Sequence, residues 1–400
     1  MRDTVIKDKG TQKHVEAFVS KLRRRQVVGS HATAIETVLL LRQVISTARF
    51  NTLDQLVTIV KAAGRQIIEA QPKEHSIGNI VRKVLRLIRE EFNAAATAAG
   101  ATSSPTSTPP ARATQLPPPT PASAVVPPSS SLSNFVLLGH PRSNQSLAVE
   151  QASQGHPRQG SGHGEHSEEF KAMSVKPALI DAIKDVIDEL ETVYDGVAKN
   201  ARDHIHADEI ILTIGKSRTV EAFLKSAAHY RKFTVIVAET APSFSGRDMA
   251  QSLSASGIST VLVPDSCVYA LMSRVNKVIL GAHAVLANGG VFAISGSLIA
   301  AAAARAHATP VVICTGQYKF TPLWNLYHEY AAVDFGDPAQ VLAAKDSEGI
   351  DMDKVDIVNP YYDYVKPELV DVLITNEGDH PPSYVYRVVK EAYDEEDSDL

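Results

Sequence analysis

Residues 277–322 read KVILGAHAVLANGGVFAISGSLIAAAAARAHATPVVICTGQYKFTP. The apolar run Val278–Leu280 predicts a buried strand that leads towards a turn at Asn288-Gly289-Gly290. An alanine-rich segment that begins near Ser295 predicts a helix, and a second apolar strand is expected over Pro310–Cys314. A strand, a crossover helix and a strand make a βαβ unit, which favours a parallel sheet with both faces covered.

The same alternation of strands and helices continues over residues 171–400. A long helix is expected from Ser174 to about Asp203, before the sheet begins. The other expected strands are Ile210–Ile214, Phe233–Ala238, Thr260–Val263 and Val372–Thr375, and the helices between them lie near Thr219–His229, Arg247–Ser254 and Ser266–Arg274. This order predicts an α/β domain with a Rossmann-like, doubly wound parallel sheet.

Residues 1–93 are predicted to form an N-terminal antiparallel helical domain. Their apolar residues recur at helical spacing, and short polar breaks separate the helical segments. Ser30 is placed to cap a second helix, Thr52 is placed to start a third, and a fourth is expected over residues 76–91.

Two segments are expected to lie outside any packed core. Residues 94–170 are predicted to be a flexible insertion, because nine of the 22 prolines fall between Pro105 and Pro128. Such a composition buries too little apolar surface to offset its ordering entropy, although Phe135–Leu138 forms an apolar island. The acidic end, Asp394–Leu400, is expected to fray.

The composition limits the partners and the compartment. A net charge of −5 gives no reason to expect nucleic acid as a direct partner. Cys267 and Cys314 are the only cysteines, which favours a reduced intracellular protein without a disulfide framework or a zinc site. The first residues lack an apolar signal core, and no apolar run reaches membrane-spanning length. We therefore expect a cytoplasmic protein without membrane contact.

Two short motifs resemble chemical signatures but lack the context that the chemistry requires. Gly215-Lys216-Ser217 follows a strand, yet the glycine that a phosphate-binding loop needs five positions earlier is Ile210. His204-Ile205-His206-Ala207-Asp208 precedes a strand instead of following one, and Glu209 stands where a further histidine would be needed. We expect neither a nucleotide P-loop nor a metal site, and we assign no catalytic residue.

A crevice outside the carboxyl ends of the strands is the candidate binding pocket, because doubly wound sheets bind ligands there. The residues expected to face it are Lys216, Arg218, Glu239, Asn288, Gly289 and Lys319. Their charges suit an anion or a sugar phosphate. A structural turn flanked by solvated lysines fits the same residues equally well.

Four segments carry a resemblance to a known superfamily. They read ILTIGKSRTVEAFL (211–224), AETAPSFSGRDMAQSL (238–253), GAHAVLANGG (281–290) and TPVVICTGQYKFTP (309–322). The superfamily contains methylthioribose-1-phosphate isomerases, ribose-1,5-bisphosphate isomerases and the regulatory subunits of eukaryotic translation initiation factor 2B. The resemblance covers residues 11–93 and 174–393.

The isomerases of this superfamily use a cysteine after the first strand and an aspartate in the segment that matches residues 281–290. Their reaction moves a proton between adjacent sugar carbons and therefore needs an acid–base pair. In this chain Gly215 stands at the cysteine position and His283 at the aspartate position. The resemblance therefore implies a chain without isomerase activity, whose crevice is a vestigial pocket that includes Gly215 and His283.

The C-terminal run NPYYDYVKPELVDVLITNEGDHPPSYVYRVVKEAY (359–393) is similar to the beta type of the regulatory subunits. The long insertion resembles that of fungal members. The resemblance implies a non-catalytic subunit of a guanine-nucleotide exchange factor, with no cofactor. Its partners would be alpha, delta, gamma and epsilon subunits and initiation factor 2, chiefly the alpha subunit of that factor, whose phosphorylation the complex senses.

The resemblance also suggests residues for these contacts. The expected subunit interface comprises Asn359, Pro360, Tyr362, Asp363, Tyr364 and Val365, and ordinary core packing is the alternative for these residues. The expected contact with initiation factor 2 comprises Arg23, Arg24, Arg25 and Arg49, and a solvated helix end is the alternative there. Two other functions stay open: a sugar-phosphate isomerase, and a sugar-phosphate-binding sensor of the same fold.

Overall fold

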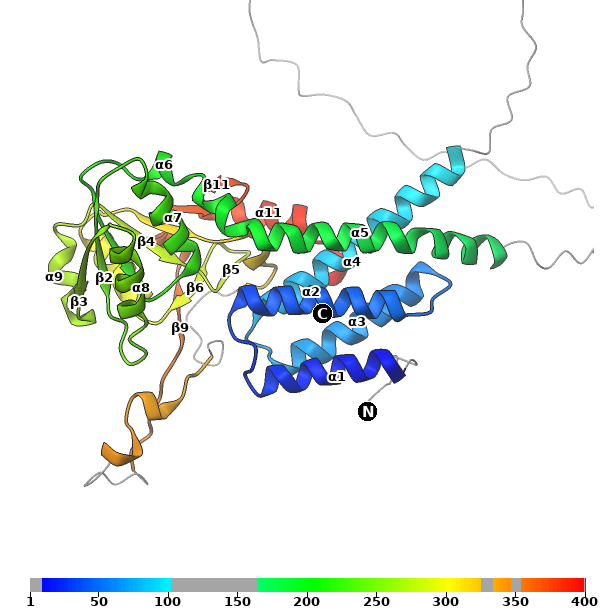
Figure 1. Cartoon of the computed structure of the whole chain (residues 1–400), viewed down its shortest axis with the longest axis horizontal. Coiled ribbons are helices and arrows are strands. Elements are labelled where there is room, and N and C mark those ends of the chain that lie inside the picture. Colours follow the sequence, from blue (N-terminus) through cyan, green and yellow to red (C-terminus); the bar gives the residue numbers. More distant parts are fainter. Residues whose placement is uncertain (1–8, 102–164, 325–333, 347–353, 399) are drawn as a thin grey trace, which may run out of the picture.

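The computed structural model describes residues 9–101, 165–324, 334–346, 354–398 and 400 (Figure 1). A group of long helices lies beside an α/β domain, as the sequence predicts. The long helices are α1 (Lys9–Arg23), α2 (Ser30–Thr47), α3 (Leu53–Ala70), α4 (His75–Ala101) and α5 (Glu165–Ala198). The helices α4 and α5 both reach into the range predicted as an insertion, and Phe135–Leu138 lies outside the described residues. Within the described residues, no helix is long and apolar enough to cross a membrane.

The starts of two helices differ in how they are capped. Thr52 begins α3 as predicted, because its side chain accepts a hydrogen bond from the backbone N–H of Gln55. Ser30 was expected to cap α2, but Gly29 occupies that position and Ser30 is the first helical residue. The hydroxyl of Ser30 instead contacts His283 of the α/β domain at 2.9 Å. The side chain of Ser30 therefore contributes to the contact between the domains and does not cap the helix.

The main sheet has seven strands in the order β11-β10-β7-β4-β1-β2-β3. Their bounds are β1 (Ile210–Ile214), β2 (Thr234–Ala238), β3 (Ser259–Val263), β4 (Lys277–Gly281), β7 (Val311–Cys314), β10 (Val372–Thr375) and β11 (Gly378–His380). All pair in parallel except β11, which runs antiparallel to β10. The chain winds from β1 outward through β2 and β3, and then from β4 outward through β7 and β10. The predicted doubly wound sheet is confirmed, with its switch point between β1 and β4.

Helices cover both faces of this sheet. Apolar side chains of α7 (Arg218–Ala228) and α8 (Ser245–Ala255) pack on one face. Those of α9 (Val268–Met272), α10 (Ser297–Ala306) and α11 (Val385–Ala392) pack on the other. The predicted crossover helix is present as α10, which follows β5 and β6 and leads into β7, and β7 pairs in parallel with β4. The short helix α6 (Ala201–His204) leads from α5 into β1.

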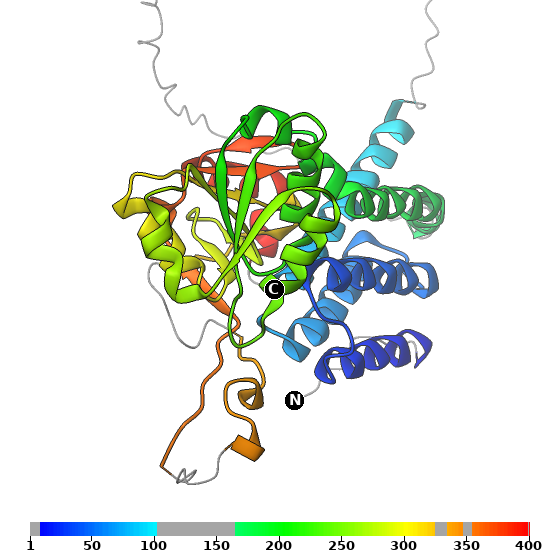
Figure 2. The ribbon, with the colours of Figure 1, turned by 60° about the vertical axis from the view of Figure 1, so that its left-hand side comes forward.

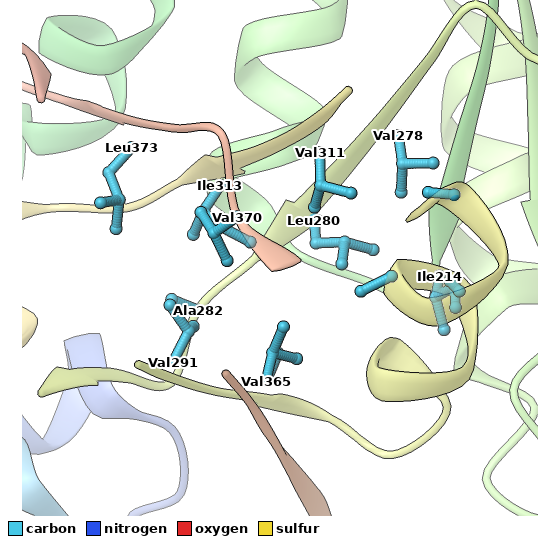
Figure 3. Close-up of a cluster of buried hydrophobic side chains, with 14 of the residues drawn as sticks. Ile214, Val278, Leu280, Ala282, Val291, Val311, Ile313, Val365, Val370 and Leu373 are labelled. Carbon is cyan, nitrogen blue, oxygen red and sulfur yellow. The ribbon is translucent and has the colours of Figure 1, made fainter. Parts of the chain in front are cut away.

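A second, four-stranded sheet was not predicted from the sequence. It has the order β8-β5-β6-β9 and comprises β5 (Ala284–Leu286), β6 (Val291–Ile294), β8 (Phe320–Thr321) and β9 (Tyr362–Val365). Val291 and Val365 of this sheet point into the same apolar cluster as Leu280 and Ile313 of the main sheet (Figure 3). The two sheets therefore share one core.

The turn at Asn288-Gly289-Gly290 connects the two central strands of this second sheet. The backbone N–H of Leu286 donates to Gly290 O at 2.8 Å, and Gly289 has a φ of 82°. Such a positive φ favours glycine. A side chain on Gly289 would also crowd the backbone of Pro382. The turn is thus a hairpin connection, which explains its glycines without any ligand.

Two features of the remaining chain complete the fold. Residues 334–346 and 354–361 project from the α/β domain as an arm, drawn in orange beside the ends of the long helices (Figure 2). The acidic end of the chain does not fray, because Asp397 is 1% exposed and contacts α3 and α4. The prediction of a frayed end was therefore wrong. Asp394 and Asp397 pair with basic side chains that lie more than 300 residues earlier, and Glu395 pairs with Lys390.

Replacing Gly246 by alanine should destabilise the α/β domain. A Cβ at this position, at the start of α8, would overlap the carbonyl oxygen of Ala238 at the end of β2. Because backbone and not a flexible side chain stands in the way, we expect a loss of about 1–3 kcal/mol. Thermal unfolding would measure it, with Ser254→Ala on the exposed side of the same helix as control. Equal stability of the two variants would contradict the close approach.

Candidate functional site

A cavity of about 450 Å³ lies at the switch point of the main sheet. Loops after β1, β2 and β4 form one side of it, through residues 216–219, 240–245 and 281–283. Residues 28–32, at the start of α2, and residues 359–362, at the base of the arm, form the other side. The helical domain thus covers the crevice that the sequence predicts at the carboxyl ends of the strands.

The loop after β2 is held in an uncommon backbone conformation. Thr240 and Phe244 have φ values of 61° and 53°, which non-glycine residues rarely adopt. Asp265 fixes this loop, since its two carboxylate oxygens accept from the backbone N–H groups of Thr240 at 2.9 Å and of Ala241 at 2.7 Å. Glu239, which was expected in the pocket, pairs with Arg247 at 2.9 Å and does not line the cavity.

Gly215, after β1, has a backbone conformation that opposes a side chain. Its φ is 62°, and a Cβ there would lie 2.7 Å from Cδ1 of Ile294. A cysteine at this position would be both strained and crowded. The local backbone therefore fits glycine and opposes any side chain at this position.

His283 joins the two domains. It is 9% exposed, and its Nδ1 lies 2.9 Å from the hydroxyl of Ser30. Its Nε2 lies 3.2 Å from the carbonyl oxygen of Lys73, which can only accept a hydrogen bond. The imidazole also stacks on Tyr362, with 4.0 Å between ring centroids. Because both ring nitrogens face groups of the helical domain, the ring is committed to an interdomain contact.

Cationic groups surround the cavity. Lys216 and Arg218 are exposed at its rim. The ammonium of Lys319 donates to Ala282 O at 2.7 Å, and burial lowers the pKa of Lys319 to about 8, against the opposing effect of Glu74. Burial also lowers the pKa of His31, whose Nε2 contacts Leu190 O at 2.8 Å. The arrangement is suited to hold an anion, and it offers no acid–base pair facing a common substrate atom.

The structure does not bring every predicted pocket residue together. Lys216, Arg218, His283 and Lys319 line the cavity, and Gly215 lies directly beside it. Asn288 and Gly289 do not line it, because they belong to the hairpin turn of the second sheet, where Asn288 Nδ2 donates to the hydroxyl of Tyr364 at 2.9 Å. Sequence reasoning missed Ser30 and His31, since residues at the start of a distant helix carry no local signal for this crevice.

The segment 359–365 lies partly in the core and partly at the cavity. Tyr364 and Val365 are buried within this chain. Asp363 caps α10, since its Oδ2 accepts from the backbone N–H groups of Gly296 at 2.8 Å and Leu298 at 3.1 Å. Asn359, also buried, ties the arm together through a 3.0 Å hydrogen bond from Nδ2 to Asp337 O, while Pro360 and Tyr362 line the cavity.

The four arginines of the predicted contact lie at two separate places. Arg23 and Arg24 are exposed at the end of α1. Arg25 Nη2 donates to both carboxylate oxygens of Asp334 in the arm, at 2.7 and 2.8 Å. Arg49 is exposed beyond the far end of α2, which has 18 residues and is therefore about 27 Å long. The four arginines do not form one patch.

The side chains of the two motifs that resemble a phosphate-binding loop and a metal site make structural contacts. Ser217 caps α7, because its hydroxyl accepts from the backbone N–H of Val220 at 3.4 Å. His204 contacts Asp379 at 2.6 Å, whereas His206 contacts Glu209 at 3.3 Å. The two histidines thus bind different carboxylates.

Comparison with protein families and curated proteins identifies relatives over nearly the whole chain. The model of the Initiation factor 2 subunit family matches residues 26–382. Translation initiation factor eIF2B subunit beta of Schizosaccharomyces pombe is 40% identical over 399 residues, which cover 96% of this chain and 97% of that protein. The corresponding protein of Dictyostelium discoideum is 44% identical over 96% of this chain and 95% of its own length. A ribose 1,5-bisphosphate isomerase of Pyrococcus furiosus is 28% identical over 55% of this chain and 68% of that protein.

Solved structures show the same relationship. The crystal structure of eIF2B beta from Chaetomium thermophilum matches with a TM-score of 0.68 and 28% identity, covering 99% of this chain and 96% of that one. A chain of the tetrameric eIF2B-beta2-delta2 complex from the same organism matches with a TM-score of 0.64 and 27% identity, covering 98% of both chains.

The contact between the domains should weaken in acid because of His75. This histidine stacks on Phe292 of the second sheet, and burial lowers the pKa of His75 to about 3, with further lowering by His283, Lys73 and Arg82. Below the ordinary histidine pKa of about 6.5, His75 therefore binds a proton in the unfolded chain but not in the folded chain. The free energy of unfolding then falls by up to about 1.4 kcal/mol for each pH unit.

Replacing His75 by phenylalanine should remove this cost. Relative to the unaltered chain, the variant should gain thermal stability steadily as the pH falls from 7 to 4.5. His229→Phe, at an exposed position, serves as control. A stability difference for His75→Phe that stays constant over this pH range would rule the effect out.

Proposed function

The chain belongs to the initiation factor 2 subunit family, and on this premise we propose that it acts as a regulatory subunit of the guanine-nucleotide exchange factor for translation initiation factor 2. The observation that carries the proposal is 40–44% identity to two eIF2B beta subunits over at least 95% of each chain. A cytoplasmic location is part of the same proposal.

The subunit has no catalytic activity of its own under this proposal. Gly215 has a backbone conformation that disfavours a thiol, and both ring nitrogens of His283 face the helical domain. The acid–base pair that an isomerase needs is therefore not available in the cavity. A second candidate, a sugar-phosphate sensor without turnover, is favoured by the three cations Lys216, Arg218 and Lys319 at the cavity. Sugar-phosphate isomerisation is the least supported of the three functions.

The partners of the subunit follow from the same relationship. The name of the solved beta2-delta2 complex indicates a delta-type subunit as the direct partner. Alpha, gamma and epsilon subunits would complete the exchange factor, and the alpha subunit of initiation factor 2 would be the regulated ligand. For the interface we propose the segment 359–365, in which Tyr364 and Val365 anchor the backbone and Pro360 and Tyr362 present accessible surface.

After co-expression with a delta-type subunit, native mass spectrometry should detect a stable heteromeric complex. The chain expressed alone should be aggregated or unstable. In the complex, Tyr362→Ala should weaken the association at least tenfold, because aromatic side chains carry much of the energy of an interface. Tyr386→Ala, 44% exposed on α11, is the matched control. A self-sufficient homodimer with a bound sugar phosphate would instead support the sensor.

The exposed arginines at the end of α1 are proposed to contact initiation factor 2 and to read its phosphorylation. Arg24→Glu should change the inhibition of GDP release by phosphorylated factor about tenfold, because the reversed charge repels a phosphate. Arg25 is less suited to this test, since its guanidinium also holds the arm through Asp334. Arg274→Glu, at an exposed position of the α/β domain, is the control, and unchanged inhibition in Arg24→Glu would exclude the contact.

A further inference from the structure

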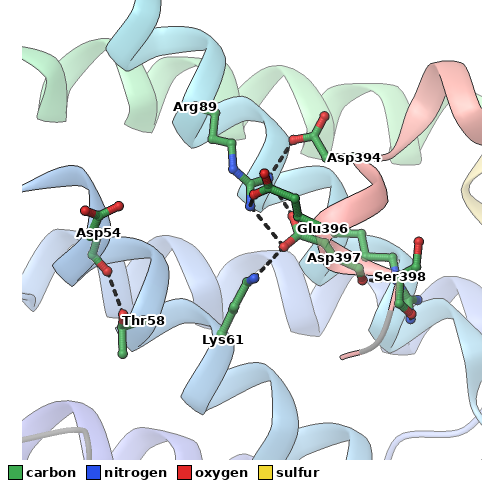
Figure 4. A network of polar contacts seen from close by, with 9 residues as sticks. Asp54, Thr58, Lys61, Arg89, Asp394, Glu396, Asp397 and Ser398 are labelled. Atoms are coloured by element: carbon green, nitrogen blue, oxygen red, sulfur yellow. Dashed lines mark hydrogen bonds and ion pairs between the residues drawn. The ribbon is translucent and has the colours of Figure 1, made fainter.

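The acidic end of the chain lies in a basic site on the helical domain (Figure 4). Residues 395–397 form one 3₁₀ turn that follows α11 of the α/β domain. The site consists of Lys61 from α3 and of Arg82 and Arg89 from α4. Arg82 and Arg89 are seven residues apart and therefore project from the same side of the helix. The segment thus connects the end of one domain to the surface of the other.

The contacts of this segment are specific for carboxylates. Arg89 forms a fork with Asp397, from Nη1 to Oδ2 at 2.6 Å and from Nη2 to Oδ1 at 3.0 Å. The same Nη1 donates to Asp394 at 2.5 Å, and Lys61 Nζ lies 2.7 Å from Asp397 Oδ1. The side chain of Asp397 is 0% exposed, so its charge is neutralised entirely by these cations. A buried carboxylate without such partners would be strongly unfavourable.

The 3₁₀ turn explains why two carboxylates reach one guanidinium. The backbone N–H of Asp397 donates to Asp394 O at 3.1 Å, and residues three apart are eclipsed in such a turn. Asp394 and Asp397 therefore project to the same side. Arg82 reads the backbone that follows, donating to Asp397 O at 2.9 Å and Ser398 O at 3.0 Å. The site thus recognises a short turn with acidic residues at its first and fourth positions.

The charges of the site match an acidic segment, and Leu400 adds an apolar contact with the core of the helical domain. Three cations face two inner carboxylates, because Glu396 is 82% exposed and lies 3.8 Å from Arg89. Tyr393, which precedes the turn, is anchored in the α/β domain by a hydrogen bond from its hydroxyl to Phe320 O at 2.9 Å. The turn itself is therefore held to the helical domain by ion pairs and hydrogen bonds, while Leu400 packs beyond the turn. A competing acidic segment can replace these ion pairs and hydrogen bonds.

We propose that Lys61, Arg82 and Arg89 form a binding site for acidic peptides, and that the chain's own residues 394–398 occupy it as an exchangeable ligand. While bound, the segment fastens the α/β domain to α3 and α4. A segment of another protein with two carboxylates spaced in the same way would compete for the site and release this fastening. The tethered segment has the advantage of a high effective concentration, so the site is occupied in the absence of a competitor.

The test uses a fluorescein-labelled peptide of residues 393–400, YDEEDSDL, and the full chain. Asp397→Asn should release the chain's own segment and bind the peptide at least tenfold more tightly than the unaltered chain does. Adding Arg89→Met to this variant should abolish the binding. Glu396→Gln, an exposed neighbour, should behave like the unaltered chain. Raising the salt concentration from 0.05 to 0.5 M should weaken the peptide complex several-fold, because the contacts are ionic.

Hydrogen exchange of residues 394–398 reports release independently of peptide binding. Fast exchange in Asp397→Asn together with peptide binding supports the proposal. Fast exchange without peptide binding would overturn it, as would an unreleased segment or binding that survives Arg89→Met. If Asp397→Asn does not fold, Asp394→Asn keeps the buried carboxylate and decides the question with the same measurements.

Discussion

The position of the helical domain over the carboxyl ends of β1 and β4 is the constraint on which the rest of the structure depends. A doubly wound sheet leaves an open crevice at its switch point. Here the start of α2 covers that crevice, and the imidazole of His283 contacts both the start of α2 and the turn between α3 and α4. The crevice becomes a bounded cavity, and its lining is shared between two domains. Any change in the angle between the domains must alter this cavity.

This use of His283 bears directly on function. A side chain cannot serve a reacting substrate while its ring nitrogens are engaged in a structural contact and its ring is stacked on Tyr362. At the neighbouring strand end, Gly215 has a left-handed backbone in which a cysteine would be strained. Gly215 and His283 thus both have structural roles in this fold. Lys216, Arg218 and Lys319 still line the cavity. The cavity can therefore bind an anion without catalysing its conversion.

The sequence was informative wherever the structure depends on local pattern. The inner strands β1, β2, β4 and β7 are short, continuous apolar runs because both of their faces are buried, and β1, β7 and β10 begin and end within the predicted ranges. The second sheet was not predicted because β8 and β9 have only two and four residues and pair with strands far away in the sequence. Because that sheet was not predicted, Asn288 and Gly289 were assigned to the crevice. The acidic end was misjudged for the same reason, since Lys61 and Arg89 are distant in sequence.

Two of the contacts that join the domains lie at separate places. One is the packed contact of His283 with the start of α2, and the other is the ionic contact of residues 394–398 with α3 and α4. These contacts differ in physical character, because the first buries aromatic rings whereas the second neutralises charges. Salt, acid or a competing anion therefore acts on them unequally, and the second can open while the first holds. Because α2, α3 and α4 share one apolar core, the ionic contact on α3 and α4 is connected through that core to the start of α2 at the cavity. A regulatory subunit needs a connection of this kind, in which a partner that binds at a surface remote from the crevice changes the geometry of the whole domain pair.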